Sequence, residues 1–142
     1  MKAITLWQPW ATLIGEKLME TRGRRINYRG ALAIHAALKI DYEACEVPEI
    51  KAALAELGYT DPNMLPVGSI VSTCTVFDCV EMKESVDGST IVPGYKLSKK
   101  ERAFGDYRPG RYAYILANVK RLKEPIPAKG KQGLWNWEGM VS

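Results

Sequence analysis

The sequence predicts an α+β fold built around a small mixed or antiparallel sheet. Several segments carry apolar residues that alternate or run continuously between Gly and Pro residues, which is typical of strands. Other segments carry helix caps and apolar residues at helical spacing. Because the two kinds of segment do not alternate regularly, a parallel βαβ sheet is not expected. The 142 residues show no internal repeat and no linker, so a single domain over 1–142 is expected.

The first elements follow from alternation and from proline. Residues 2–7 alternate moderately and predict the first strand. Pro9 then begins a short helix that ends near Gly15, since proline fits the first turn of a helix. An arginine-rich loop at 22–29 precedes an apolar run at 31–36, which is typical of a buried strand.

The middle of the chain combines helix signals with the strongest strand signal. Residues 41–58 begin with Asp41 as a helix N-cap and end with Gly58 as a stop. Pro48 is expected to divide this segment into two short helices. Residues 69–82 carry Ile, Val, Thr and Phe on both faces, so a long, buried or curled strand is expected there.

The last elements are shorter and more polar. Residues 85–94 are expected to form a polar loop, and capping-box spacing predicts a short helix over 98–104. Residues 111–119 alternate as a strand does. Pro125 and Pro127 are expected to end the continuation of that strand.

The charge of the chain is unevenly distributed. The formal net charge is +4, yet residues 1–30 carry +4, residues 41–61 carry −5 and residues 96–131 carry +8. The last block ends in a basic, glycine-rich loop at 129–133. If the two basic blocks meet in the fold, they form a surface for a polyanion. The alternative is that they are separate solvated faces.

The composition of the chain also argues against several classes of protein. No apolar run approaches the roughly 18 residues of a membrane span, and the first residues lack the apolar core of a secretory signal. Cys45, Cys74 and Cys79 lack metal-like spacing and share the chain with a single His. We therefore expect reduced thiols in a cytoplasmic protein, with no metal, no cofactor and no membrane partner.

The most informative motif is Gly15-x-Lys17-x-x-Glu20-x-Arg22, directly after the first predicted helix. If the chain is extended there, Glu20 and Arg22 share one face, because side chains alternate with a period of two. Two cations and a carboxylate then converge on one pocket. Such a pocket suits a polar, partly anionic ligand or a proton transfer.

This motif and the blocks around it resemble the ASCH family, a branch of the PUA-like β-barrel superfamily. The GxKxxExR pattern of that family is matched at every fixed position. One further block precedes the motif, Leu6-Trp7-Gln8-Pro9-Trp10-Ala11. Others follow it in the expected order, so that the resemblance covers nearly the whole chain: Tyr28-Arg29-Gly30, Leu32-Ala33-Ile34-His35-Ala36, Leu65-Pro66-x-Gly68, Gly110-Arg111-Tyr112-Ala113 and Gln132-Gly133-Leu134-Trp135.

The resemblance implies a small PUA-like β-barrel with a few flanking helices and a cleft at the motif. Members are generally thought to bind RNA or other nucleic acids. A few small bacterial members resemble enzymes: one type hydrolyses the amide of N4-acetylcytidine, and ribonuclease activity is reported for another. We therefore expect a domain that binds RNA or a nucleotide. The alternatives are a hydrolase of a modified nucleoside and, less favoured, a ribonuclease.

Lys17 and Glu20 are the catalytic candidates if the chain is an enzyme. Lys17 occupies the place of the lysine that is catalytic in the hydrolase-type members. Glu20 stands where those members carry a threonine, and it keeps the glutamate of the broader family. A second acid would also be needed, for which Asp78 and Glu81 are candidates. The non-catalytic alternatives are a phosphate contact or a solvated position for Lys17, and a counter-charge role for Glu20, which we favour.

The candidate ligand-binding residues are Gln8, Trp10, Lys17, Arg22, Arg29, His35 and Trp135. Arg22 and Arg29 belong to a cluster with Arg24 and Arg25 that suits phosphate groups, although a flexible charged loop is the alternative. His35, the only histidine, is either a core residue or a ligand or acid–base group.

The tryptophans are candidates for stacking on bases. Trp135 lies beside the basic loop and is the favoured stacking residue, while Trp10 and Trp137 are expected to stack or to pack in the core. Gln8 is assigned to the edge of a base through its side-chain amide, on position alone.

Overall fold

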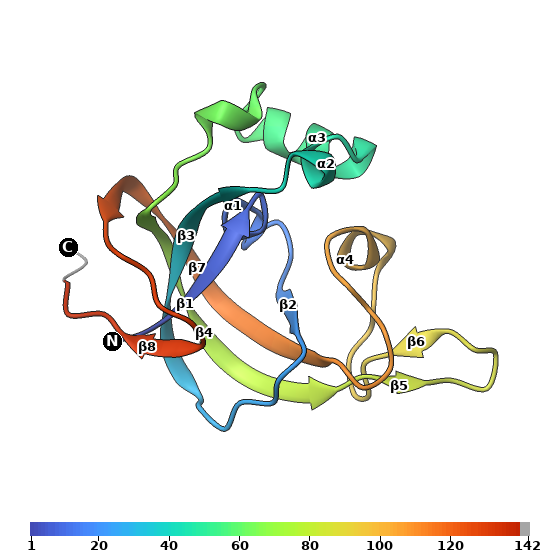
Figure 1. Ribbon diagram of the computed structural model, residues 1–142. Coiled ribbons are helices and arrows are strands. Elements are labelled where there is room, and N and C mark those ends of the chain that lie inside the picture. Colours follow the sequence, from blue (N-terminus) through green and yellow to red (C-terminus); the bar gives the residue numbers. More distant parts are fainter. Residues whose placement is uncertain (140–142) are drawn as a thin grey trace.

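The computed structural model describes residues 1–139, and Figure 1 shows a curved sheet with short helices beside it. The fold is mixed α+β, as the sequence predicts. The strands are β1 (Lys2–Gln8), β2 (Met19–Arg22), β3 (Gly30–Ile40), β4 (Ser69–Glu81), β5 (Lys83–Glu84), β6 (Thr90–Ile91), β7 (Tyr112–Pro127) and β8 (Leu134–Asn136). The helices are α1 (Trp10–Leu13), α2 (Tyr42–Cys45), α3 (Pro48–Glu56), the 3₁₀ helix η1 (Pro62–Met64) and α4 (Lys99–Ala103).

Six strands form one sheet in the order β2-β7-β4-β3-β1-β8. β1 and β3 run parallel, whereas all other neighbours in this sheet run antiparallel. Within residues 1–139 no strand ladder joins β2 to β8, so the pairing does not confirm the closed barrel expected from the family resemblance. β5 and β6 form a separate two-stranded ribbon, which projects to one side in Figure 1.

The prediction that Pro125 and Pro127 end the last long strand is wrong. The strand continues through Pro125 and Pro127, and Ile126 still pairs with Ile70 of β4. β2 pairs only with residues 112–115 of β7, so further along β7 keeps one neighbour in the sheet, on the β4 side. A proline is tolerated in such a strand because its missing N–H can face the free edge.

Three other boundaries differ from the predictions. β3 runs on to Ile40, past the predicted end at residue 36, and β6 occupies part of the predicted loop at 85–94. The first helix covers only Trp10–Leu13 rather than 9–15. Ile14 is already extended, with ψ of 122°, and Gly15 has φ of +112°, a value that glycine adopts without strain.

The predicted helix caps are confirmed. The Asp41 side chain accepts a hydrogen bond from the backbone N–H of Ala44 at 3.1 Å. Pro48 divides the helical segment, as predicted, and stands at the first position of α3. The Ser98 hydroxyl caps α4 in the same way, accepting from the N–H of Glu101 at 3.1 Å.

Two main apolar cores hold the elements in place. One lies inside the curved sheet, and the other joins α1, α2 and α3 to the end of α4. Leu13, Ile50, Leu54 and Phe104 are at most 3% exposed in this second core. Phe104 therefore anchors the segment after α4 against the rest of the fold. No helix within the described part of the chain is long and apolar enough to cross a membrane.

All three cysteines have free thiols, as predicted. Cys45 and Cys74 are buried, and burial raises the pKa of the Cys74 thiol to about 12. The thiolate is the nucleophilic form of cysteine, so Cys74 carries almost none of this form near neutral pH.

Candidate functional site

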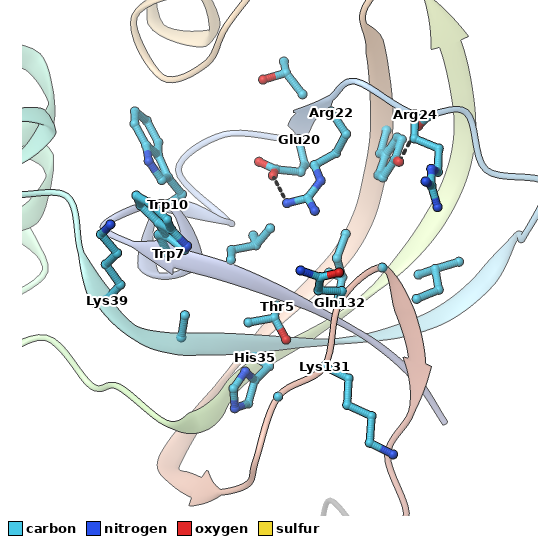
Figure 2. A pocket seen from close by; sticks show the side chains of 18 of the residues that line it. Thr5, Trp7, Trp10, Glu20, Arg22, Arg24, His35, Lys39, Lys131 and Gln132 are labelled. Carbon is cyan, nitrogen blue, oxygen red and sulfur yellow. Dashed lines mark hydrogen bonds and ion pairs between the residues drawn. The ribbon is translucent and has the colours of Figure 1, made fainter.

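A large cleft of about 1890 Å³ is open to solvent on one side of the sheet. Its walls come from β1, β2 and the C-terminal part of β3, from the chain after α4, and from the loop at 128–133. Leu134 of β8 also lines it, so both end strands of the sheet reach this cleft. Figure 2 shows side chains from these segments converging on the same space.

The GxKxxExR motif forms part of the cleft wall. After the left-handed Gly15 the chain turns and enters β2, which is extended as expected. The prediction that Glu20 and Arg22 share one face is confirmed, because both line the cleft and their Oε2 and Nη1 atoms lie 3.7 Å apart. Figure 2 shows both side chains pointing into the cleft.

Lys17 is the most buried charged side chain of the motif, with 1% exposure. Its Nζ donates to Glu20 Oε1 at 3.0 Å and to the backbone carbonyl of Phe104 at 2.9 Å. The same atom lies 5.3 Å from the ring centroid of Trp10. Two of the three ammonium donors are thus used inside the protein, and Glu20 supplies the counter-charge that a buried ammonium requires.

The two basic blocks of the sequence meet in this cleft, which decides between the two alternatives stated above. Block 1–30 supplies Arg22 and Arg24, and block 96–131 supplies Arg111, Lys129 and Lys131. Among the described residues, seven basic side chains line the cleft against two acidic ones: Lys17, Arg22, Arg24, Lys39, Arg111, Lys129 and Lys131 against Glu20 and Asp106. The cleft therefore attracts anions.

His35 lines the cleft below the loop at 128–133 and is only 3% exposed. Its Nε2 lies 2.7 Å from the carbonyl oxygen of Ala128, and because a carbonyl only accepts, Nε2 carries the hydrogen. Gly130 packs so closely on His35 that an added Cβ would lie 2.7 Å from Nδ1 and from Thr5 Oγ1. His35 thus helps to hold the basic loop in place, and glycine is required at the point of contact.

Three predicted ligand-binding residues lie outside the cleft lining. Gln8 is fully buried, its amide nitrogen donating to Pro66 O at 2.7 Å and its oxygen accepting from Thr12 N at 3.0 Å, so it cannot read the edge of a base. Trp135 is 7% exposed and donates to Thr5 Oγ1 at 3.1 Å.

Arg29 is the third. It bonds the carbonyl oxygens of Ile26 and Tyr28 and lies 3.6 Å from Asp78. Neither candidate for a second acid lines the cleft. Asp78 accepts a hydrogen bond from the Tyr95 hydroxyl at 2.8 Å, and Glu81 pairs with Lys83 at 3.1 Å.

Asp106 is the acid that the structure places in the cleft instead. The hydrogen bonds from Arg108, whose Nε lies 2.7 Å away, hold the pKa of the Asp106 carboxyl below its usual range. Asp106 follows a glycine in a short loop after α4, and nothing in its local sequence marks it. It stays ionised and adds no proton donor to the cleft.

Sequence reasoning also missed the exposed aromatic part of the cleft. Trp7 and Lys39 line it, and their side chains lie together on one side in Figure 2. A signal for Trp7 was present in the sequence, because the alternation over residues 2–7 places Trp7 on the same face as the polar Thr5 and opposite the apolar Leu6. Lys39 carried no such signal, because the strand predicted from the sequence ends at residue 36, whereas β3 continues to Ile40.

The described residues contain no group of three or more His, Cys, Asp or Glu side chains that could hold a metal ion. The cleft instead offers guanidinium and ammonium donors, tryptophan rings and one buried carboxylate. The fold and the cleft define an α+β protein with a basic, partly aromatic cleft.

The chain can be compared with protein families, with curated proteins and with solved structures. No protein-family model matches the chain, and no curated protein matches it. The crystal structure of a point mutant of the ZmASCH protein from Zymomonas mobilis is similar, with a TM-score of 0.45 and 16% identity over 89% of this chain and 74% of that chain.

Proposed function

We propose that the chain binds RNA or a nucleotide in this cleft. The observation that carries the proposal is the excess of basic side chains around a cleft that also exposes tryptophan. Guanidinium and ammonium groups bind phosphates, and aromatic rings stack on unpaired bases. RNA with unpaired bases is preferred over duplex DNA, because an unpaired base can leave its stack and enter a pocket.

The proposal includes three expectations from the sequence. They are a single domain over 1–142, a PUA-like barrel and a cytoplasmic location. The barrel is supported by β2 and β8, which are the end strands of the sheet and yet line the same cleft. The location is supported by the three free thiols.

The test is a salt titration of binding to a labelled single-stranded RNA of about 12 nucleotides. The double variant Arg24→Gln/Lys131→Gln removes two exposed cations of the cleft. For single strands, each lost phosphate contact reduces the slope of log K against log salt by about 0.7, so we expect a slope shallower by about 1.4. At physiological salt the affinity should fall roughly ten-fold.

The matched control is Lys51→Gln/Lys120→Gln, which removes the same charge at exposed positions outside the cleft lining. Its slope and affinity should stay at the wild-type values. Equal losses in both double variants would mean that only net charge matters, and would argue against binding in the cleft. Absence of RNA binding by the wild type even at low salt would refute the proposal.

The hydrolase is retained as a second candidate because Lys17 and Glu20, the catalytic candidates, are hydrogen-bonded on the cleft wall. In that case water adds across the amide of N4-acetylcytidine and releases cytidine and acetate. We expect turnover by the wild type and its loss in Glu20→Gln, which keeps a hydrogen-bond acceptor for Lys17 but removes the carboxylate. Chromatography of the products checks this. Unchanged turnover in Glu20→Gln would exclude the carboxylate from the chemistry.

A further inference from the structure

Trp7 is the most exposed tryptophan of the chain. The residue is 47% exposed, whereas Trp135 and Trp137 are 7% and 6% exposed. Trp10 is partly buried, packs against both main cores and has the Lys17 ammonium over its ring. Only Trp7 therefore presents a large part of its indole to the cleft.

The exposure of Trp7 follows from its place on β1. Side chains alternate along a strand, and the neighbours Leu6 and Gln8 are 2% and 0% exposed on the interior side. Trp7 must then point away from that interior. A tryptophan side chain gains much stability when it is buried, so core packing does not explain a tryptophan at this position.

Lys39 covers part of the Trp7 ring. Its Nζ lies 4.1 Å from the ring centroid, within the range of a cation–π contact. The contact depends on an irregularity in the sheet: Leu6 is opposite Ala36, but Gln8 is opposite Ile40. The extra residues of β3 between these pairs bring Lys39 to Trp7. Trp7 is 47% exposed with Lys39 in this position, so part of the indole remains accessible to a flat ligand group.

The cleft is asymmetric around this ring. In Figure 2 Trp7 and Lys39 lie at the left, whereas Arg24 lies at the upper right and Lys131 at the bottom, right of centre. An aromatic surface at one side and phosphate-binding groups at the other match the two parts of a nucleotide. A purely apolar partner would instead bury several cleft cations without counter-charges, which is costly.

From this arrangement, and resting on the proposed function, we infer that Trp7 is the stacking residue of the site. An unpaired nucleobase lies on the Trp7 ring, and the attached phosphates extend toward the arginine and lysine side chains across the cleft. Lys39 holds the ring in position and adds a cation close to the backbone. The ligand class is therefore a nucleotide unit with both a base and a phosphate, rather than a polyanion without bases.

The experiment compares Trp7→Ala with the wild type on two ligands. One is a single-stranded RNA, and the other is the same ribose-phosphate chain without bases. Stacking on an aromatic side chain predicts that Trp7→Ala binds the RNA about 5- to 150-fold more weakly. The chain without bases should bind both proteins equally. Trp7→Leu, which keeps apolar volume but has no aromatic face, should behave like Trp7→Ala, and Trp7→Phe should retain part of the affinity.

Each other result has a defined meaning. If the wild type binds RNA and Trp7→Ala binds it equally well, the inference is wrong while the proposed function stands. If the variants lose affinity for both ligands equally, Trp7 supports the fold or the backbone contacts and the inference is again wrong. Circular dichroism of each variant confirms that it is folded. If Trp7→Ala does not fold, Trp7→Leu replaces it in the binding comparison. If the wild type binds neither ligand, both the inference and the proposed function fail.

Discussion

Replacing Lys17 with methionine should lower the free energy of unfolding by about 3–5 kcal/mol. The substitution keeps the apolar stem but removes the ammonium that bonds Glu20 and the Phe104 carbonyl. Glu20 is 7% exposed, so its charge would remain largely buried. Arg22, 3.7 Å away, compensates in part and favours the lower end of the range. Urea unfolding followed by circular dichroism measures the change.

The control is the double variant Lys17→Met/Glu20→Gln. It removes both charges of the pair, so it should recover much of the stability that the single variant loses. A loss below about 1 kcal/mol in Lys17→Met would contradict the assignment of a buried pair, because that is the size expected for an exposed one. The result also matters for function: a loss of activity in any Lys17 variant indicates catalysis only if the fold survives.

Phe104→Ala should destabilise the protein by a similar amount, about 3–5 kcal/mol. The Phe104 ring is 1% exposed and packs in the second core with Leu13 and Ile50. Truncation to alanine leaves a cavity between α3 and the end of α4. The backbone carbonyl that accepts from Lys17 is kept, so the experiment separates the contribution of the ring from that of the polar contact.

Phe104→Leu is the matched comparison, because leucine fills most of the same volume and should cost less than Phe104→Ala. Thermal or urea unfolding of both variants gives the difference. Equal stability of the two variants would mean that the core around residue 104 collapses freely onto the smaller side chain. A wild-type-like Phe104→Ala would show that the second core does not hold α4.

The local chemistry of the chain predicts the elements whose signals are short-range. The Asp41 and Ser98 caps, the division at Pro48 and the extended segment at Glu20 and Arg22 all depend on neighbours within a few residues. Such signals act through backbone conformation and the nearest hydrogen bonds. They are readable without knowing the rest of the fold.

The ends of β7 and β3 depend on partners that are distant in the sequence. Pro125 is compatible with β7 because β2 pairs only with the other end of that strand. β3 continues past residue 36 beside β1, where the irregular register also brings Lys39 to Trp7. No local pattern encodes either fact, because sheet order determines them.

By itself, the sequence determined the α+β class, the helix caps, the motif with Lys17 and Glu20, and the presence of two basic blocks. Only the tertiary structure decided that those blocks meet in one cleft, that Gln8 and Trp135 are buried, and that Trp7 lines the cleft and is exposed. The physical reason is that charge and conformational preference belong to single residues and their neighbours. Burial and convergence on a site arise only when distant strands pair.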